Sequence, residues 1–411
     1  MKKERTEHNA IGQGVRAEDA LEPAALAKGV GGQEALEQGK TNPAVGVSCR
    51  RVKVRLAERS YEVLLGTEIW PAGVAELQRF SPEEEVFVVT DERVHRLYGE
   101  ELTGLLEEAG YRPFTYILEA GEASKTWVNA EKILDSMLAR NFSRQVPLLA
   151  LGGGVVGDLA GFVAALYRRG VPFIQIPTTL LAQVDSSVGG KVAVNHPRGK
   201  NMLGTFYQPR AVWADLRTLD TLDEREWQAG LAEVLKYALL WDAGFFTFLE
   251  THAREIIARD NPPVLAAMIE RCVQIKAEIV RRDERDEGLR HILNLGHTIG
   301  HALEKATGFQ QYRHGEAVAI GMRAAGMLAV KLGLFSAAKL ARVEKLMQEW
   351  GLPMNLSGST VREIPEQIKL DKKVANKEVA FVLPVAIGKV TVQKGIAEEI
   401  LMQVLEELAE K

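Results

Sequence analysis

The spacing of apolar and polar residues predicts alternating strands and helices through the first half of the chain. Val52, Val54 and Leu56 alternate with charged residues, which is the period of a half-buried strand, and a second strand after the next turn would complete a hairpin. This rhythm predicts a mainly parallel sheet with helices on both faces. Further strands are expected at residues 85–91, 114–120, 146–154 and 171–179, with helices at 92–110 and 129–141.

The pattern changes after about Thr221. Helical spacing dominates from there, and a small hairpin at 381–392 precedes a terminal helix. We therefore expect an α/β domain over residues 48–221 and a mostly helical domain over 222–411. Residues 1–47 contain no aromatic residue and no persistent apolar face, so we expect a flexible extension with at most one short helix at 18–29. The helical segments of the second half are expected at 225–240, 261–283, 295–308 and 315–333.

Composition narrows the class of protein. The formal net charge of the 411 residues is −4, which argues against nucleic acid or an anionic membrane as the main partner. The two cysteines, Cys49 and Cys272, form no disulfide framework, so a cytoplasmic protein is expected. No charge-free stretch reaches the ~20 apolar residues of a membrane-spanning helix. The N-terminus lacks the apolar core of a secretory signal.

A glycine-rich loop, LGGGVVGD at residues 151–158, stands between a predicted strand and a predicted helix. Gly152, Gly154 and Gly157 match G-x-G-x-x-G, in which glycines let the backbone approach a pyrophosphate at a helix N-terminus. The acidic residue expected about 20 positions later is missing, and a tight strand-to-helix turn is the plain structural alternative. We expect nucleotide binding in a non-standard arrangement, with Asp91 as a ribose acceptor and Asp158 near a second ribose.

The stretch GHTIGHALE, residues 296–304, indicates a metal site. His297 and His301 stand four residues apart and would share one face of a helix, so spacing alone suggests that both bind one zinc ion. His314 and Glu233 are the candidates for a further ligand. A single histidine is more often a structural residue, but three of the eight histidines fall between positions 297 and 314.

Basic residues between positions 169 and 290 indicate an anionic substrate. Arginine suits bidentate recognition of carboxylate, and lysine acts as a point charge for phosphate. Glu233 and Lys236 also occupy an otherwise apolar helix, where an acid and a base are unusual. The cationic candidates, with one amide among them, are Arg169, Lys191, Lys200, Asn201, Lys276 and Arg290.

Together these segments resemble the 3-dehydroquinate synthase family, from about residue 50 to the C-terminus. The resemblance implies an N-terminal α/β domain with Rossmann-like NAD binding and a mostly α-helical, metal-binding C-terminal domain. It implies conversion of the sugar phosphate 3-deoxy-D-arabino-heptulosonate 7-phosphate to 3-dehydroquinate and phosphate, with NAD reduced and reoxidised in each turnover. It also implies a homodimer. The matching segments are GEASK (121–125), LGGGVVGDLAGFVAALYRRGV (151–171), IPTTLLAQVDSSVGGKVAVN (176–195), GKNMLGTFYQP (199–209), GLAEVLKYALL (230–240), LNLGHTIGHALE (293–304) and HGEAVAIGM (314–322).

The resemblance also assigns roles to residues. It implies that Glu233, His297 and His314 bind one divalent metal, zinc or alternatively cobalt, and that His301 lies on the substrate side. For NAD it points to Asp91, Glu122, Lys125, Gly154, Val155, Val156, Gly157, Asp158, Thr178, Thr179, Lys191, Lys200, Thr218, Leu219, Asp220 and Thr221. For substrate and catalysis it points to Arg169, Asp185, Lys191, Asn201, Lys236, Lys276, Arg290, Asn294 and His301, with Lys372 or Lys373 in addition.

One departure from the family pattern concerns residues 283–290. The family has D-E-x-E-x-G-x-R, and this chain has DERDEGLR, which puts Asp286 where glutamate is expected. Either Asp286 still reaches its partner or Glu287 takes its place.

Three other functions stay open on the sequence alone. They are another sugar phosphate cyclase, such as a 2-epi-5-epi-valiolone or 2-deoxy-scyllo-inosose synthase, a metal-dependent polyol dehydrogenase of the glycerol dehydrogenase type, and an inactive NAD-binding scaffold.

Overall fold

The computed structural model describes residues 49–357, 361–375 and 379–409, and of residues 370–375 only the backbone. The extension at 1–47 and its expected short helix therefore lie outside the described residues. Within the described ranges, no helix is both long enough and apolar enough to cross a membrane.

A seven-stranded sheet organises the first half of the described chain, in the order β1-β2-β9-β6-β5-β3-β4. Only β1 and β2 pair antiparallel, as the hairpin predicted from the sequence; the other neighbours pair parallel. The mainly parallel sheet is therefore confirmed. Its strands are β1 (Arg50–Val54), β2 (Tyr61–Gly66), β3 (Glu85–Asp91), β4 (Arg112–Leu118), β5 (Leu148–Gly152), β6 (Phe173–Pro177) and β9 (Ala211–Asp215).

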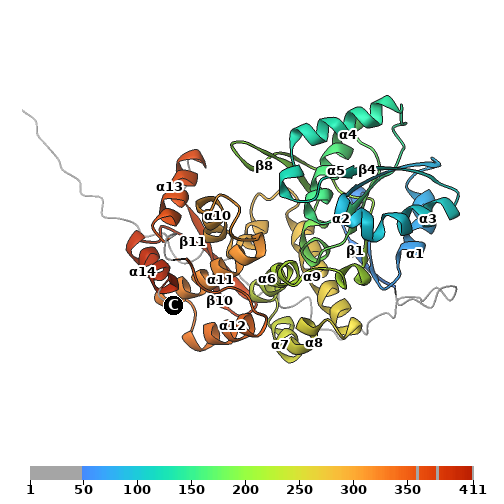
Figure 1. Cartoon of the computed structure of the whole chain (residues 1–411). Helices are drawn as coiled ribbons and strands as arrows, with labels where there is room; N and C mark the ends of the chain where they lie inside the picture. The colour runs from blue at the N-terminus through green and yellow to red at the C-terminus, as the bar shows by residue number, and fades with distance from the viewer. Residues whose placement is uncertain (1–48, 358–360, 376–378, 410–411) are drawn as a thin grey trace, which may run out of the picture. The chain divides into compact units, whose positions relative to one another are not determined.

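Alternating side chains along the strands enter different cores. On β3, Phe87 and Val89 pack with α4 and α5, whereas Val86 and Val88 pack with α1 and α3 on the other face. Because successive side chains of a strand point to opposite faces, a strand with two apolar faces requires cover on both. The helices of this half are α1 (Trp70–Ala75), α2 (Glu92–Val94), α3 (Glu100–Glu108), α4 (Trp127–Ala139) and α5 (Gly154–Leu166) (Figure 1).

Short turns join these elements. The helix predicted at 92–110 is interrupted by a π turn, η4, between α2 and α3. The turns are η2 (Ala57–Arg59), η3 (Leu77–Arg79), η4 (His95–Gly99), η5 (Glu122–Ser124), η6 (Tyr167–Arg169), η7 (Ala182–Ser186) and η8 (Leu216–Leu219).

The hairpin of β7 (Lys191–His196) and β8 (Gly199–Phe206) was not predicted from the sequence. The middle of its first strand is buried and packs against α5, whereas most of β8 is exposed. This hairpin carries several of the predicted ligand-binding side chains.

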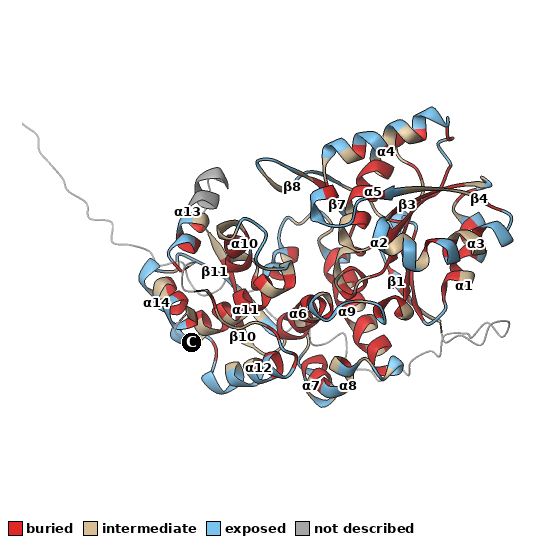
Figure 2. Ribbon diagram, in the orientation of Figure 1, coloured by how far each residue is buried: buried red, intermediate tan, exposed pale blue. Residues whose placement is uncertain are grey.

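The second half of the described chain is mostly helical, as predicted. α6 and α11 are buried along much of their length (Figure 2). α6 and α9 share a core with Val63 of β2 and Val212 of β9, so the helices pack on one end of the sheet. The elements are α6 (Glu224–Trp241), α7 (Ala243–Thr251), α8 (Ala253–Ala258), α9 (Pro262–Arg282), η9 (Leu289–Asn294), α10 (His297–Ala306), α11 (His314–Lys331), α12 (Ala337–Glu349), α13 (Glu363–Ala375), β10 (Ala380–Ala386), β11 (Lys389–Lys394) and α14 (Glu398–Ala409).

Candidate functional site

Three helices bring one carboxylate and two imidazoles together. Glu233 lies on α6, and His297 and His314 are the first residues of α10 and α11. The Oε1 atom of Glu233 lies 3.6 Å from Nε2 of His297 and 3.5 Å from Nε2 of His314. The three ligand atoms lie within 4.8 Å of one another, so one ion could reach all of them. Three protein ligands leave coordination positions open, as in catalytic zinc sites.

The Glu233 carboxylate fits a cation at this point. Its side chain is buried, yet Oε1 has no hydrogen-bond partner among the described residues. A buried carboxylate oxygen without a donor or cation is costly, so an ion beside it would remove that cost. Lys236 forms an ion pair with Oε2, which leaves the side that faces the imidazoles for the metal.

Both imidazoles are oriented through their Nδ1 atoms. His297 Nδ1 lies 3.1 Å from the carbonyl oxygen of Leu295, and His314 Nδ1 lies 3.4 Å from Oε2 of Glu304. Such outer contacts fix the ring orientation of metal-binding histidines. Burial lowers the pKa of His297 to about 3, so its Nε2 lone pair is available at neutral pH.

His314 differs from His297 in its protonation. Burial would lower the pKa of His314, but the nearby carboxylates of Glu233 and Glu304 outweigh it and raise that pKa to about 9. A metal ion that binds Nε2 would therefore displace a proton.

Glycines beside two of these ligands let the helices approach closely. A Cβ at Gly315 would lie 1.9 Å from the carbonyl oxygen of Ala229 on α6. Gly296 has a φ of +80°, and a Cβ there would lie 2.7 Å from the carbonyl oxygen of Val318 on α11. The short ligand-to-ligand distances thus depend on positions that tolerate only glycine.

His301 lies one turn further along α10 and belongs to a different group. Its ligand atom clusters with those of Glu304 and His314, not with Glu233. The two groups share only His314, whose Nε2 faces Glu233 and whose Nδ1 faces Glu304. Helical spacing suggested that His297 and His301 act as equal ligands, but the geometry places only His297 beside Glu233.

A network of buried charges lies next to this metal group. Lys276 Nζ donates to both the carbonyl oxygen and Oδ1 of Asp185, at 2.7 and 2.8 Å. Lys236 Nζ lies 3.9 Å from the same Oδ1, and the hydroxyl of Tyr237 donates to it. Burial would raise the pKa of Asp185, but Lys276 and Lys236 hold that pKa well below its usual range. Burial lowers the pKa of Lys276 to about 8, although Asp185 opposes the shift.

The β7–β8 hairpin brings polar side chains towards the helical half. Lys200 Nζ lies 3.2 Å from Oε1 of Glu304 and 4.4 Å from the centroid of the Phe309 ring. Asn201, with a φ of +56°, accepts a hydrogen bond of 2.6 Å from Lys125 Nζ. The hairpin therefore links the strand-edge loops with α10.

Asp286 reaches the hairpin as well. Its carboxylate forms an ion pair with Lys191, and its φ of +62° is a conformation that aspartate adopts more easily than most residues. The neighbouring Glu287 instead donates its backbone N–H to Asp283. Of the two alternatives left open by the sequence, Asp286 is the one that contacts the lysine.

The remaining predicted substrate residues differ in how far they are buried and in their contacts. Arg290 is buried and donates to the carbonyl oxygens of Glu284 and Gly189, while its Nε has no partner among the described residues. Arg169 and Asn294 are exposed, and within the described ranges no hydrogen bond or ion pair ties either of them to the metal group. Lys372 and Lys373 fall where the side chains lie outside the described residues.

The predicted cofactor residues lie at the carboxyl ends of parallel strands. Asp91 ends β3, and the glycine loop follows β5. The chain leaves β3 towards β4 on one side and leaves β5 towards β6 on the other, so the strand order reverses between them. Ligands of open α/β sheets bind outside the carboxyl ends at such a reversal.

The start of α5 fits a pyrophosphate. Gly153 is the N-cap of α5, and no side chain caps the first amides of the helix. Free N–H groups at a helix N-terminus bind anions. The helix also packs tightly, because a Cβ at Gly157 would lie 2.6 Å from Oε1 of Gln175.

Three further predicted cofactor residues meet around α5 and the hairpin. Lys125 Nζ donates to Oδ2 of Asp158 at 2.5 Å, and Glu122 accepts from Asn195 at 2.7 Å. Burial raises the pKa of Asp158 in spite of Lys125. Asp158 therefore faces a lysine of the GEASK segment in the structure described here.

β6 and β9 stop pairing with each other before their carboxyl ends, and one of the two threonine pairs follows each of these ends. Thr178 and Thr179 follow β6, and Thr218 to Thr221 lie on and after η8. Thr178 and Thr218 are buried, whereas Thr221 is exposed and its Oγ1 lies 2.5 Å from the hydroxyl of Tyr98. Asp91 already caps α2, since its Oδ1 accepts from the backbone of Arg93 and Val94.

Sequence reasoning missed two side chains of this site. Tyr237 binds Asp185, and Glu304 connects His314 with Lys200. A signal existed for Glu304, which follows His301 by three residues and so shares its helix face. Tyr237 gave no signal beyond standing next to Lys236.

Comparisons with known proteins agree along nearly the whole described chain. The family model for the 3-dehydroquinate synthase N-terminal domain matches residues 115–229, and that for the C-terminal domain matches residues 230–374. A 3-dehydroquinate synthase from Thermodesulfovibrio yellowstonii is 45% identical, over 87% of this chain and 99% of the relative. One from Nitrosococcus oceani is 49% identical, over 85% of this chain and 97% of the relative.

A solved structure shares the fold. The 2-epi-5-epi-valiolone synthase from Streptomyces hygroscopicus subsp. jinggangensis, with NAD+ and Zn2+ bound, is 32% identical and aligns with a TM-score of 0.80. The alignment covers 87% of this chain and 98% of that structure.

Proposed function

The chain belongs to the 3-dehydroquinate synthase family, and we propose that it catalyses the reaction that gives the family its name. In this reaction 3-deoxy-D-arabino-heptulosonate 7-phosphate gives 3-dehydroquinate and phosphate, a step of the shikimate pathway to the aromatic amino acids. The observation that carries the proposal is the Glu233, His297 and His314 group beside the ion pair of Asp185 with the buried Lys276.

The cofactors are NAD and one divalent metal, as in the related cyclase solved with NAD+ and Zn2+. Glu233, His297 and His314 would hold zinc, or cobalt as the alternative. The uncapped start of α5 and the loops after β3, β6 and β9 would hold NAD. When bound, the metal supplies Lewis acidity to a substrate hydroxyl, and NAD accepts a hydride and returns it within one turnover.

Side chains of this chain would bind and orient the substrate. Lys191, Asn201 and Lys276 offer donors to the phosphate, and the guanidinium groups of Arg169 and Arg290 suit the carboxylate. His301, with Asn294, is the group we assign to proton transfer. A His301→Ala variant that kept full turnover would remove that role.

Lys236 and Asp185 neutralise neighbouring charged side chains and are not assigned to the phosphate. Lys236 neutralises one oxygen of Glu233, and Asp185 neutralises Lys276. Because burial makes isolated charges costly, each of these groups keeps its ionised form only beside its partner.

Location and assembly belong to the same proposal. We propose a cytoplasmic homodimer, on the strength of the family resemblance and the two free cysteines. The domain boundary at residues 221 and 222 also stays a prediction; it precedes the start of α6 at Glu224.

The direct test supplies the seven-carbon sugar phosphate with NAD+ and zinc, and measures phosphate release together with NADH absorbance. We expect stoichiometric phosphate without accumulation of NADH, and loss of both phosphate release and product after treatment with a chelator. Net NADH from simple polyols, without phosphate release, would instead indicate a polyol dehydrogenase. A product other than 3-dehydroquinate would indicate a different sugar phosphate cyclase.

A further inference from the structure

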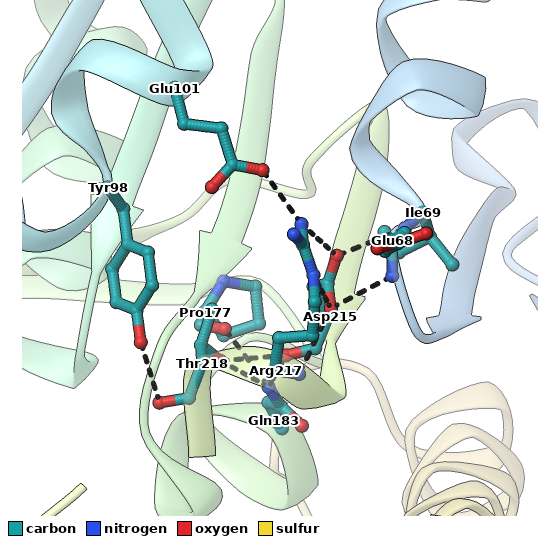
Figure 3. Close-up of polar contacts among 9 residues, drawn as sticks. All are labelled: Glu68, Ile69, Tyr98, Glu101, Pro177, Gln183, Asp215, Arg217 and Thr218. Atoms are coloured by element: carbon teal, nitrogen blue, oxygen red, sulfur yellow. Dashed lines mark hydrogen bonds and ion pairs between the residues drawn. The ribbon is translucent and has the colours of Figure 1, made fainter. Parts of the chain in front are cut away.

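The carboxylate of Asp215, at the end of β9, is fully buried and heavily bonded (Figure 3). It accepts hydrogen bonds from the backbone N–H groups of Glu68 and Ile69, at 3.2 and 3.0 Å. It also accepts from the backbone N–H of Arg217 at 3.0 Å, and from the Nε and Nη2 atoms of its guanidinium at 3.2 and 3.1 Å. The same guanidinium donates to Glu101 of α3 at 2.9 Å. One side chain thus ties the end of β9 to the start of α1 and to α3.

The backbone carbonyl of Asp215 is held from the opposite side. Its oxygen accepts a hydrogen bond of 2.7 Å from the hydroxyl of Thr218 and one of 3.0 Å from Nε2 of Gln183. Gln183 Nε2 also lies within hydrogen-bond distance of the Pro177 carbonyl oxygen, at 3.2 Å, and of Thr218 Oγ1, at 3.1 Å (Figure 3). Gln183 is itself fully buried.

These contacts span a split in the sheet. β6 and β9 pair only at Ile174 with Ala211 and at Gln175 with Val212. Beyond this point β6 stays paired with β5 up to Pro177, and β9 stays paired with β2 up to Asp215. The amide of Gln183 therefore bridges two strand ends that no longer bond to each other.

Both strand ends lead directly into segments that the proposed function assigns to NAD. Thr178 and Thr179 follow Pro177, and the Thr218–Thr221 segment follows Asp215. The hydroxyl of Thr218 is buried and occupied by Asp215 and Gln183, so it serves the network. Tyr98 supports the far end of the segment through Thr221 Oγ1.

We propose that Asp215 is a positioning residue for the cofactor: its carboxylate and carbonyl, linked through Gln183, set the distance between the two threonine segments. Asp215 and Gln183 have no exposed surface, so they act through the segments they hold. This inference rests on the proposed function, because it assumes that the two segments bind NAD.

The test measures NAD+ affinity by equilibrium titration of the full chain, and turnover at saturating NAD+. We expect Asp215→Asn to weaken NAD+ binding by on the order of ten-fold. The asparagine lacks the negative charge that pairs with the guanidinium, and its NH2 group faces donors from which it cannot accept a hydrogen bond. Turnover at saturating NAD+ should change less than about two-fold, because the metal group is untouched.

Asp242→Asn is the matched control. Asp242 caps α7 and pairs with the guanidinium of Arg271, as Asp215 caps η8 and pairs with that of Arg217. Its side chain is 21% exposed, and it lies in the helical half. Both variants should lose stability, and only Asp215→Asn should lose NAD+ affinity. Equal NAD+ affinity in wild type and Asp215→Asn, or equal losses in both variants, would overturn the inference.

A gentler pair decides the question if Asp215→Asn does not fold. Thr218→Val removes the hydroxyl from the network, and Thr218→Ser keeps it. We expect a several-fold loss of NAD+ affinity in the valine variant and recovery in the serine variant. Loss in both, or in neither, would overturn the inference. A wild-type chain that binds no NAD+ would refute the proposed function itself, which the variants alone cannot do.

Discussion

The two candidate binding regions of this protein are built in different ways. The strand-edge region, made of the loops after β3, β5, β6 and β9, offers backbone N–H groups, glycines and mostly uncharged side chains. The helix-terminus region instead concentrates charged side chains, several of them buried. It consists of Glu233, His297, His314 and the neighbouring Asp185, Lys236 and Lys276. A long cofactor needs a shaped surface, and backbone can supply it. A metal ion needs a few ligand atoms at short distances, which only side chains can supply here.

This contrast predicts different sensitivities. In the helix-terminus region each charge keeps its state through its neighbours, so the loss of one group should disturb the whole cluster. In the strand-edge region the truncation of an exposed side chain should matter little. An added Cβ should matter where the backbone is close-packed, and so should the loss of a buried polar group such as the Asp215 carboxylate.

The largest effect is expected at Glu233. Glu233→Gln removes the charge that the metal requires and leaves Lys236 buried without its nearest carboxylate. We expect metal stoichiometry near zero and turnover lower by roughly 10³-fold or more, since Lewis-acid stabilisation contributes several kcal/mol. Metal analysis of the purified protein and phosphate release check this. As a control, Glu344→Gln on α12 breaks the pair with Arg323 of α11 and should retain the metal. A fully metallated and active Glu233→Gln variant would show that the ligand set is wrong.

The matching change in the strand-edge region is Gly157→Ala. The new Cβ would lie 2.6 Å from Oε1 of the buried Gln175, so either this side chain or α5 must shift where the helix N-terminus would meet the pyrophosphate. We expect NAD+ affinity to fall by on the order of ten-fold with normal metal content. Gly104→Ala is the control, because a Cβ at Gly104 of α3 meets nothing within 4 Å. That variant should bind NAD+ as wild type does and gain slightly in stability. Metal loss in Gly157→Ala would contradict the separation of the two regions.

A third prediction concerns pH and Lys276. Because burial lowers the pKa of Lys276 to about 8, its ammonium is lost as the pH rises through that value. If this charge binds phosphate, KM for the substrate should rise about ten-fold per pH unit above about 8. Lys276→Arg, whose guanidinium stays charged, should lack this rise. Steady-state kinetics from pH 7 to about 10 would measure both.

Protein stability should move the other way over this range. The folded-state pKa of Lys276 lies below the unfolded value of 10.5, so between these values the unfolded chain binds more protons. This group therefore favours folding more as the pH rises, and unfolding cannot explain the loss of affinity. A substrate KM that is flat through pH 8 would exclude Lys276 from phosphate binding.

The smallest effect is expected at Asp286. Its ion pair with Lys191 is partly exposed, with 51% of the lysine side chain accessible, so the pair is worth about 0.2–1 kcal/mol. Asp286→Asn keeps a residue that tolerates the positive φ and removes the charge. We expect substrate KM to change by less than about five-fold, and kcat to stay the same. A large fall in kcat would mean that Asp286 takes part in the chemistry.

Much of the fold could be predicted from local pattern. β3 and β5 are short apolar runs between turn signals, and α6, α9, α10 and α11 repeat apolar residues at the helical period. The β7–β8 hairpin was missed because its second strand is mostly exposed and its first follows two glycines. β9 was missed because its five residues, AVWAD, include two alanines and an aspartate and so form neither a clear apolar run nor an alternation.

The site was predictable in parts. Spacing along one helix marked His297 but could not separate it from His301, since both share a face of α10. Which of the two histidines lies beside Glu233 depends on how α6 and α11 pack, and on glycines such as Gly315 that let these helices approach. The role of Asp215 had no local signal, because it comes from backbone groups far apart in the sequence.

Both regions should act on one substrate within a single turnover. The most direct test uses substrate that carries deuterium at the carbon that is oxidised and then reduced, with NAD+ supplied and unlabelled NADH also present in solution. Mass spectrometry of the product should find the deuterium fully retained, because the cofactor that accepts it returns it before leaving. Loss of the deuterium to the NADH pool or to solvent would contradict the account.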